Sequence, residues 1–138
     1  MSKLRGVLDT STLILLGRIT ALDELPEEAF ITTVTLAELS VGPLLATTDA
    51  ERVARQAHLQ AAEADFEPLP FNRAAARAFG SVAASLRHAG RKPAARAFDA
   101  MIAAIAVAHE LPLYTCNVTD FDRIDGLVVR AVHHPDEA

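Results

Sequence analysis

Four carboxylates stand beside apolar sequence or in turns and could together do chemistry: Asp9, Glu38, Asp99 and Asp120. An acidic side chain is rarely placed against apolar surface unless a partner balances its charge, and a divalent cation is one such partner. Oxygen ligands without a His or Cys cluster favour Mg²⁺ or Mn²⁺ over Zn²⁺. One such ion, or two about 3.5–4 Å apart, would support displacement at a phosphodiester.

Short polar residues flank two of these acids. Thr10 and Ser11 follow Asp9, and Thr115 and Asn117 precede Asp120. Their hydroxyl and amide groups could donate hydrogen bonds to ligand carboxylates or to a phosphate. The pattern leaves open whether Asn117 or Asp120 lies nearer to the metal.

Each acid also has a purely structural interpretation. Asp9 could cap the helix that follows it, and Thr35-x-x-Glu38 is a capping box. Asp99 suits the first turn of a helix, and Asp120 suits a turn. One observation argues against capping by Glu38. This residue shares a helical stripe with apolar residues, which predicts that its carboxylate lies at the edge of the core or in a cleft. That stripe consists of Val34, Ala37, Glu38, Val41 and Leu45.

Short apolar runs alternate with helical patterns along the chain. Strands separated by helices indicate parallel βαβ units, and hence a three-layer α/β/α domain with a mostly parallel central sheet. The predicted strands are 5–9, 29–32, 67–70, 112–116 and 127–132. The predicted helices are 12–22, 35–45, 48–65 (capped by Thr48), 72–88 (capped by Asn72) and 98–110.

This arrangement brings the acids together. Asp9 ends the first strand, Asp120 follows the strand 112–116, and Glu38 begins the helix after the second strand. Asp99 opens the helix that precedes the strand 112–116, at the carboxyl edge of the sheet in a right-handed crossover. Ligands bind beyond the carboxyl ends of parallel strands, so we expect all four acids to converge there.

Composition limits the class of protein. A chain of 138 residues with 51% hydrophobic content fits one domain spanning 1–138. Its net charge of −5 argues against a generally basic nucleic-acid binder. The single cysteine, Cys116, suits a reducing compartment, and neither a signal peptide nor a membrane span is evident. We therefore expect a cytoplasmic protein without membrane contact.

A basic stretch without acids leads up to Asp99. It contains Arg87, Arg91, Lys92 and Arg96. These cations could simply form a solvated helix end, where positive charge suits the helix dipole. Alternatively, they contact an RNA backbone beside the acidic cleft.

The order of four motifs resembles PIN domains, and more narrowly the VapC-type toxins of type II toxin–antitoxin pairs. The motifs are Asp9-Thr-Ser, Thr35-Leu-Ala-Glu38-Leu, Phe98-Asp99-Ala-Met-Ile and Thr115-x-Asn117-x-x-Asp120-Phe121, and the resemblance covers Val7 to Val132. It implies an endoribonuclease dependent on Mg²⁺ or Mn²⁺, with Asp9, Glu38, Asp99 and Asp120 as its catalytic and metal-binding site.

The resemblance also implies partners. VapC-like proteins form homodimers and are inhibited by a small VapB-type antitoxin whose tail enters the acidic cleft. In this chain, exposed apolar residues such as Leu44 and Leu45 could form the antitoxin groove.

Two other functions compete with this hypothesis. A phosphohydrolase of the haloacid dehalogenase type also uses a strand-end aspartate, but it needs a second Asp two positions later, where this chain has Ser11. A non-catalytic binding module, in which the acids only cap helices, is the third possibility.

Overall fold

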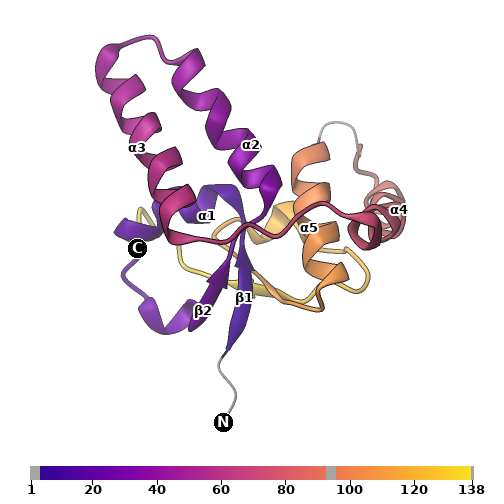
Figure 1. Cartoon of the computed structure of the whole chain (residues 1–138). Helices are drawn as coiled ribbons and strands as arrows, with labels where there is room; N and C mark the ends of the chain where they lie inside the picture. The colour runs from indigo at the N-terminus through magenta and orange to yellow at the C-terminus, as the bar shows by residue number, and fades with distance from the viewer. Residues whose placement is uncertain (1–3, 93–95, 138) are drawn as a thin grey trace.

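A four-stranded parallel sheet forms the centre of the molecule (Figure 1). The computed structural model describes residues 4–92 and 96–137. The strands lie in the order β2-β1-β3-β4, and every pairing between neighbours is parallel, as the sequence predicted. Their bounds are β1 (Arg5–Leu8), β2 (Glu28–Phe30), β3 (Leu113–Thr115) and β4 (Val129–Ala131).

Helices connect these strands. The α-helices are α1 (Thr10–Leu15), α2 (Thr33–Val41), α3 (Asp49–Asp65), α4 (Arg73–His88) and α5 (Ala97–Ala108). Short 3-10 turns are η1 (Leu16–Arg18), η2 (Leu22–Glu24), η3 (Gly42–Leu45) and η5 (Val118–Asp120).

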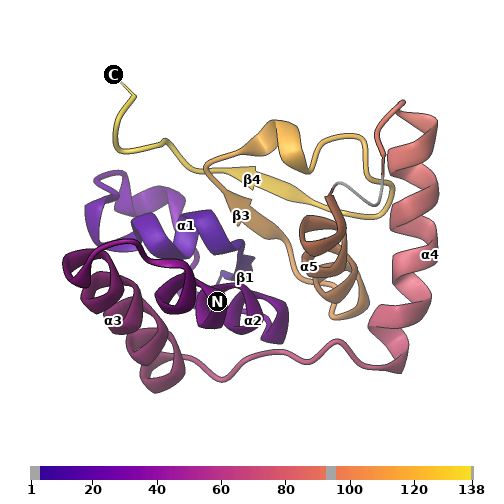
Figure 2. The ribbon, with the colours of Figure 1, turned by 90° about the horizontal axis from the view of Figure 1, so that it is seen from above.

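The two faces of the sheet are covered by different helices, which gives the predicted three layers (Figure 2). Successive side chains on a strand point to opposite faces. Val7 belongs to the core cluster that contains the buried residues of α4 and α5, such as Val82 and Ile105. Its neighbour Leu8 packs in a second cluster with Tyr114 and residues of α1.

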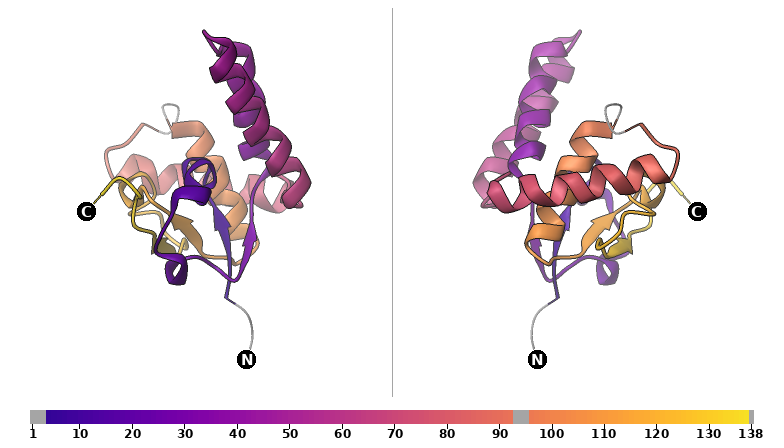
Figure 3. Two further views of the ribbon diagram at one scale, coloured as in Figure 1. Left: turned by 90° about the vertical axis from the view of Figure 1, so that its left-hand side faces the viewer. Right: turned by 90° about the vertical axis from the view of Figure 1, so that its right-hand side faces the viewer.

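Helices α2 and α3 lie side by side and project from the body as a helical hairpin (Figures 1 and 3). Ile31, Leu39 and Ala62 form a small buried cluster at its base. Toward its tip, apolar side chains stay in solvent: Leu44 is 83% exposed and Leu45 68%. The prediction that these two leucines are exposed is therefore confirmed.

The capping residues of the longer helices mostly match the sequence pattern. The side chains of Thr48 and Asn72 accept hydrogen bonds from the backbone N–H groups of Glu51 and Ala75, both at 3.1 Å. These bonds fix where α3 and α4 begin. Gly90, with φ of +77°, follows the C-terminal end of α4, where a left-handed residue commonly ends a helix.

Three predicted elements were wrong in detail. The helix predicted for 12–22 is instead the short α1 followed by η1, because Ile19 takes an extended conformation (ψ 128°) and ends the helical run. The strand predicted for 67–70 is reduced to one bridge, between Leu69 and Thr32. Pro68 and Pro70 flank Leu69 and have no N–H to donate, so the ladder cannot extend.

The helix predicted for 35–45 begins two residues earlier, at Thr33, and becomes 3-10 at Gly42. Its cap is Thr32, whose hydroxyl accepts from the backbone N–H of Thr35 at 3.1 Å. The Thr35–Glu38 capping box was therefore wrong.

The expectation of an inward apolar stripe on this helix was also wrong beyond its first turn. Val41 and Leu45 are exposed, and the buried residues of α2 are instead Val34, Thr35 and Leu39. Helix α2 leaves the body as part of the projecting hairpin, so its distal turns have no hydrophobic core to pack against.

Candidate active site

Asp9 lies immediately after β1, at the carboxyl edge of the sheet, and is only 3% exposed. Its Oδ2 accepts hydrogen bonds from the hydroxyls of Ser11 at 3.1 Å and Thr115 at 3.0 Å. Its Oδ1 is buried and has no hydrogen-bond partner among the described residues. Burial raises the pKa of Asp9, and the hydroxyl donors offset this only in part. Asp9 occupies the N-cap position of α1, but its side chain makes no capping bond.

A small polar network holds Asp9 in place. The amide Nδ2 of Asn117 donates to the Ser11 hydroxyl at 2.7 Å. The backbone N–H of Asn117 donates to Thr115 Oγ1 at 2.9 Å. The three predicted supporting residues Ser11, Thr115 and Asn117 therefore act together on one carboxylate, which they reach from two neighbouring segments.

Glu38 reaches the same edge from α2. Its Oε1 accepts a hydrogen bond from the Thr10 hydroxyl at 2.7 Å, and Thr10 Oγ1 lies 2.9 Å from the hydroxyl of Thr35. Because Thr32 caps α2, the carboxylate of Glu38 is not used as a cap. Burial raises the pKa of Glu38, and the negative charge of Asp9 raises it further.

Asp99 lies in the first turn of α5, where the negative charges of the other three predicted acids act on it. Burial, then repulsion from Asp120, Asp9 and Glu38, raises the pKa of Asp99 to about 6. The negative charges around Asp99 thus disfavour its ionised form. Asp120, in η5, has a cationic partner: Arg96 Nη1 donates to its Oδ1 at 2.8 Å.

The donor set fits a hard divalent cation. Asp9 offers a buried oxygen without a partner, which a cation would satisfy, and the excess negative charge is of the right sign. Nevertheless, within residues 4–92 and 96–137 no three Asp, Glu, His or Cys side chains are gathered as ready ligands. Glu38 is turned to Thr10 and Asp120 to Arg96. A cation at this edge would therefore be held through few protein oxygens and several waters, as Mg²⁺ commonly is.

The sequence matches one known family over most of its length. A model of the PIN domain matches residues 6–127. The chain belongs to the PIN domain family. All four acids lie within the matched range.

Relatives place this PIN domain with VapC proteins. Ribonuclease VapC5 of Mycobacterium tuberculosis is 42% identical over 123 residues, 88% of each chain. The crystal structure of VapBC-5 from the same species superposes with a TM-score of 0.77 at 37% identity, over 93% of this chain and 98% of that one. VapBC2 of Rickettsia felis, bound to a promoter DNA fragment, has a TM-score of 0.73 at 20% identity over 94% and 99%, and shows the shared fold.

The basic residues beside this PIN-domain site fall into two groups. Arg91 pairs with Asp122, and Arg96 pairs with Asp120, so both guanidinium groups are engaged within the protein. Arg87 and Lys92 are exposed, and no carboxylate of the described residues lies within salt-bridge distance of them.

Sequence reasoning missed two participants. Thr35 was taken as a cap, but its buried hydroxyl lies beside Thr10. It lies one turn before Glu38 on the same helix face, which is the spacing that could have revealed it. The pairing of Arg96 with Asp120 had no signal in the sequence, since the two residues are 24 positions apart.

Proposed function

We propose that this protein is a divalent-cation-dependent endoribonuclease and the toxin of a toxin–antitoxin pair. The observation that carries the proposal is the buried, unpartnered Oδ1 of Asp9 among three further acids. A relative that is 42% identical is named a ribonuclease, and this supports RNA as the substrate.

In this proposal Asp9, Glu38, Asp99 and Asp120 hold Mg²⁺ or Mn²⁺. When bound, the cation would neutralise charge at a scissile phosphodiester and activate a water for attack. Thr115 and Ser11 fix the direction of the Asp9 carboxylate, and Asn117 fixes Ser11 in turn. Thr10 does the same for Glu38. Such supporting hydrogen bonds determine how well carboxylates are placed for a metal.

Substrate binding also depends on the cation. Four acids at one edge repel the phosphate backbone until a divalent ion offsets their charge. Arg87 and Lys92 are candidate contacts to that backbone, because both are exposed and unpaired in the described structure. Arg91 and Arg96 could join them if their ion pairs open.

We also propose a VapB-type antitoxin as partner. Solved relatives of this fold are VapBC complexes. A groove of about 380 Å³ begins at Thr10 and Glu38 and continues over Ile14 and Leu39 to His58. A second groove of about 260 Å³ shares Ile14, Leu39 and His58 and is mostly apolar. Leu44 and Leu45, which the sequence suggested for the antitoxin groove, line neither of these two grooves. An antitoxin segment with apolar residues followed by a cation would match both the groove and the acids.

A homodimer and a cytoplasmic location complete the proposal. The homodimer is proposed from the resemblance to VapC-like proteins, and the cytoplasmic location from the single cysteine, Cys116, which suits a reducing compartment. Among the described residues, no helix is long and apolar enough to cross a membrane.

The test of the enzymatic proposal is cleavage of total cellular RNA with Mg²⁺ or Mn²⁺, with the new ends mapped by sequencing. Wild-type protein should cut at defined sites, and EDTA should abolish cutting. Asp99→Asn should lose at least about 100-fold of the rate, since a bound cation contributes several kcal/mol. The matched control is Asp125→Asn, an exposed acid outside the site. Full activity of Asp99→Asn would contradict the four-acid site.

The antitoxin proposal has a separate test. Ile14→Arg places a charge in the groove, where Ile14 is 44% exposed. This variant should cleave RNA normally yet resist neutralisation by the co-expressed antitoxin. Val128→Arg, at an equally exposed apolar position outside the groove, is the control. Normal neutralisation of Ile14→Arg would show that the antitoxin binds elsewhere.

A further inference from the structure

The overall negative charge of the chain conceals a strongly basic segment. Between Glu67 and Asp99 the sequence contains no acidic residue but six of the 13 Lys and Arg residues. The rest of the chain contains the other seven Lys and Arg residues together with all 18 Asp and Glu residues. Segregated charge of this kind creates a local positive potential on an acidic protein. The six cations are Arg73, Arg77, Arg87, Arg91, Lys92 and Arg96.

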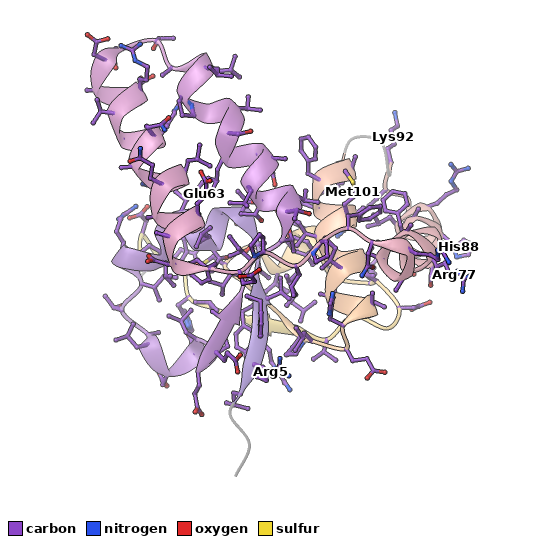
Figure 4. The ribbon with its side chains drawn as sticks, viewed as in Figure 1. Arg5, Glu63, Arg77, His88, Lys92 and Met101 are labelled. Carbon is purple, nitrogen blue, oxygen red and sulfur yellow. The ribbon has the colours of Figure 1, made fainter. Side chains whose placement is uncertain are left out.

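Helix α4 presents half of these cations on one side. Its buried residues, among them Ala75, Val82 and Leu86, face the core. At 3.6 residues per turn, Arg73, Arg77, Arg87 and His88 share the opposite side, and all four are exposed. Figure 4 shows Arg77 and His88 projecting from α4 away from the rest of the molecule.

Small residues separate the two basic ends of this side. Gly80, Ser81 and Ala84 are exposed between Arg77 and Arg87, which lie about 15 Å apart along the helix axis at 1.5 Å per residue. No large side chain stands between the cations to hold a ligand away from the helix. A long polyanion can therefore lie along α4 and contact both ends.

The arginines of α4 lack the acidic neighbours that other helices provide. On α3, Arg52 pairs with Asp49 and Arg55 with Glu51. Among the described residues, no carboxylate lies within 4.0 Å of the guanidinium groups of Arg73, Arg77 or Arg87. Their charge is left for an anion from outside the chain.

This basic side continues to the acidic site. Beyond the C-terminal end of α4, Arg91 pairs with Asp122 and Arg96 with Asp120. These ion pairs join the end of α4 to the segment that carries Asp120. Lys92 lies on this connection, near the N-terminal end of α5 (Figure 4). An anionic chain on α4 would thus lead toward the proposed metal site.

We propose that the outer side of α4, formed by Arg73, Arg77, Arg87 and His88, binds the phosphate backbone of the RNA substrate away from the cleaved bond. The proposal rests on the ribonuclease function and specifies its substrate: an RNA that extends more than about 20 Å beyond the cleavage site, since the axial length from Arg73 to Arg87 alone is of this size. Backbone contacts of this kind give affinity and position rather than sequence recognition. A short oligonucleotide would reach the acids but not α4.

The test measures RNA binding by fluorescence anisotropy in protein whose four acids are intact, with Ca²⁺ in place of Mg²⁺ so that the RNA binds without being cut. The probes are a stem-loop RNA of about 30 nucleotides and a single strand of about 6 nucleotides. Adding Arg73→Gln and Arg77→Gln together should weaken binding of the long RNA about tenfold and reduce the slope of log affinity against log salt by about 1.5 to 2. The short strand should bind unchanged. Arg130→Gln, an exposed arginine on β4, is the control and should change neither probe.

Unchanged affinity for the long RNA would overturn the proposal. So would an equal loss for both probes, or a loss that Arg130→Gln reproduces. Because the RNA stays uncut under these conditions, binding is measured separately from cleavage. A wild-type protein without ribonuclease activity would refute the proposed function, whereas the α4 variants would still decide whether this surface binds RNA.

Discussion

The hydroxyl of Thr115 donates to Asp9 Oδ2 at 3.0 Å and thereby joins two residues that are 106 positions apart. Thr115 is the last residue of β3, and Asp9 follows β1, its parallel neighbour in the sheet. The bond satisfies one carboxylate oxygen and leaves Oδ1 buried without a partner. The ends of two adjacent strands therefore leave one oxygen of Asp9 without a partner in the acidic site.

Removing this hydroxyl should weaken metal binding. Thr115→Val keeps the volume of a fully buried side chain but deletes the donor, so Asp9 loses its orientation. We expect Mn²⁺ affinity, measured by calorimetric titration, to fall about tenfold or more. Thr115→Ser retains the hydroxyl and should bind Mn²⁺ nearly as wild type. Equal affinity of the valine variant would mean that this bond has no role at the site.

The raised pKa of Asp99 predicts how stability depends on pH in EDTA. With a pKa of about 6 in the folded protein against an ordinary value of 3.8, the fold favours the protonated acid. This contribution to the free energy of unfolding is fully present below about pH 4 and is lost as pH rises through about 6. The Asn side chain of Asp99→Asn cannot ionise, so this variant should not lose this stability as the pH rises.

The measurement is Tm by differential scanning fluorimetry between about pH 4 and pH 7.5. The Tm of Asp99→Asn minus that of wild type should increase with pH in EDTA. Mn²⁺ should reverse the sign at the upper end, because the cation binds the ionised acids of the wild-type protein. A difference that stays constant with pH would contradict the repulsion among the four acids.

The ion pair between Arg96 and Asp120 predicts competition with the metal. Arg96 Nη1 lies 2.8 Å from Asp120 Oδ1, and its charge also lowers the pKa of Asp99. Arg96→Gln frees the Asp120 carboxylate and removes a positive charge from the site. Mn²⁺ should therefore bind several-fold more tightly in the absence of RNA. Arg130→Gln is again the control. Weaker Mn²⁺ binding to Arg96→Gln would instead assign Arg96 to holding the site together.

Much of this architecture could be predicted from the sequence. The alternation of apolar runs with helical patterns gave the parallel sheet, and Thr48 and Asn72 marked two helix starts correctly. These patterns depend only on residues that are a few positions apart in the sequence. The four acids were singled out because they stand beside apolar sequence or in turns, where a carboxylate calls for a partner.

What failed depended on contacts across the fold. The pattern from Val34 to Leu45 predicted a buried stripe, but α2 leaves the body as part of the projecting hairpin, and Val41 and Leu45 are exposed. The pairing of Arg96 with Asp120 and the bond from Thr10 to Glu38 join distant segments, and periodicity carries no information about such pairs. The sequence showed which residues were candidates, whereas their partners required the structure.

Two glycines provide a test of the packing. A Cβ at Gly6 would overlap the ring of Tyr114 and lie 3.2 Å from the carbonyl oxygen of Pro112, whereas one at Gly80 would meet nothing within 4 Å. Gly6→Ala should lower the free energy of unfolding by about 1–3 kcal/mol. Gly80→Ala should raise it by about 1 kcal/mol, because alanine favours an exposed helix. Urea unfolding measures both. A Gly6→Ala protein as stable as wild type would refute the close approach of Tyr114 to β1.

The central claim is that the four acids bind the divalent cation that RNA cleavage requires. Its most direct test follows Mn²⁺ binding by electron paramagnetic resonance in wild-type, Asp9→Asn and Asp99→Asn proteins, in parallel with RNA cleavage at the same Mn²⁺ concentrations. We predict that wild-type binding and cleavage rise together as Mn²⁺ is added, and that both are lost in each variant. RNA cleavage by a wild-type protein that binds no Mn²⁺, or by variants that have lost Mn²⁺ binding, would contradict the account.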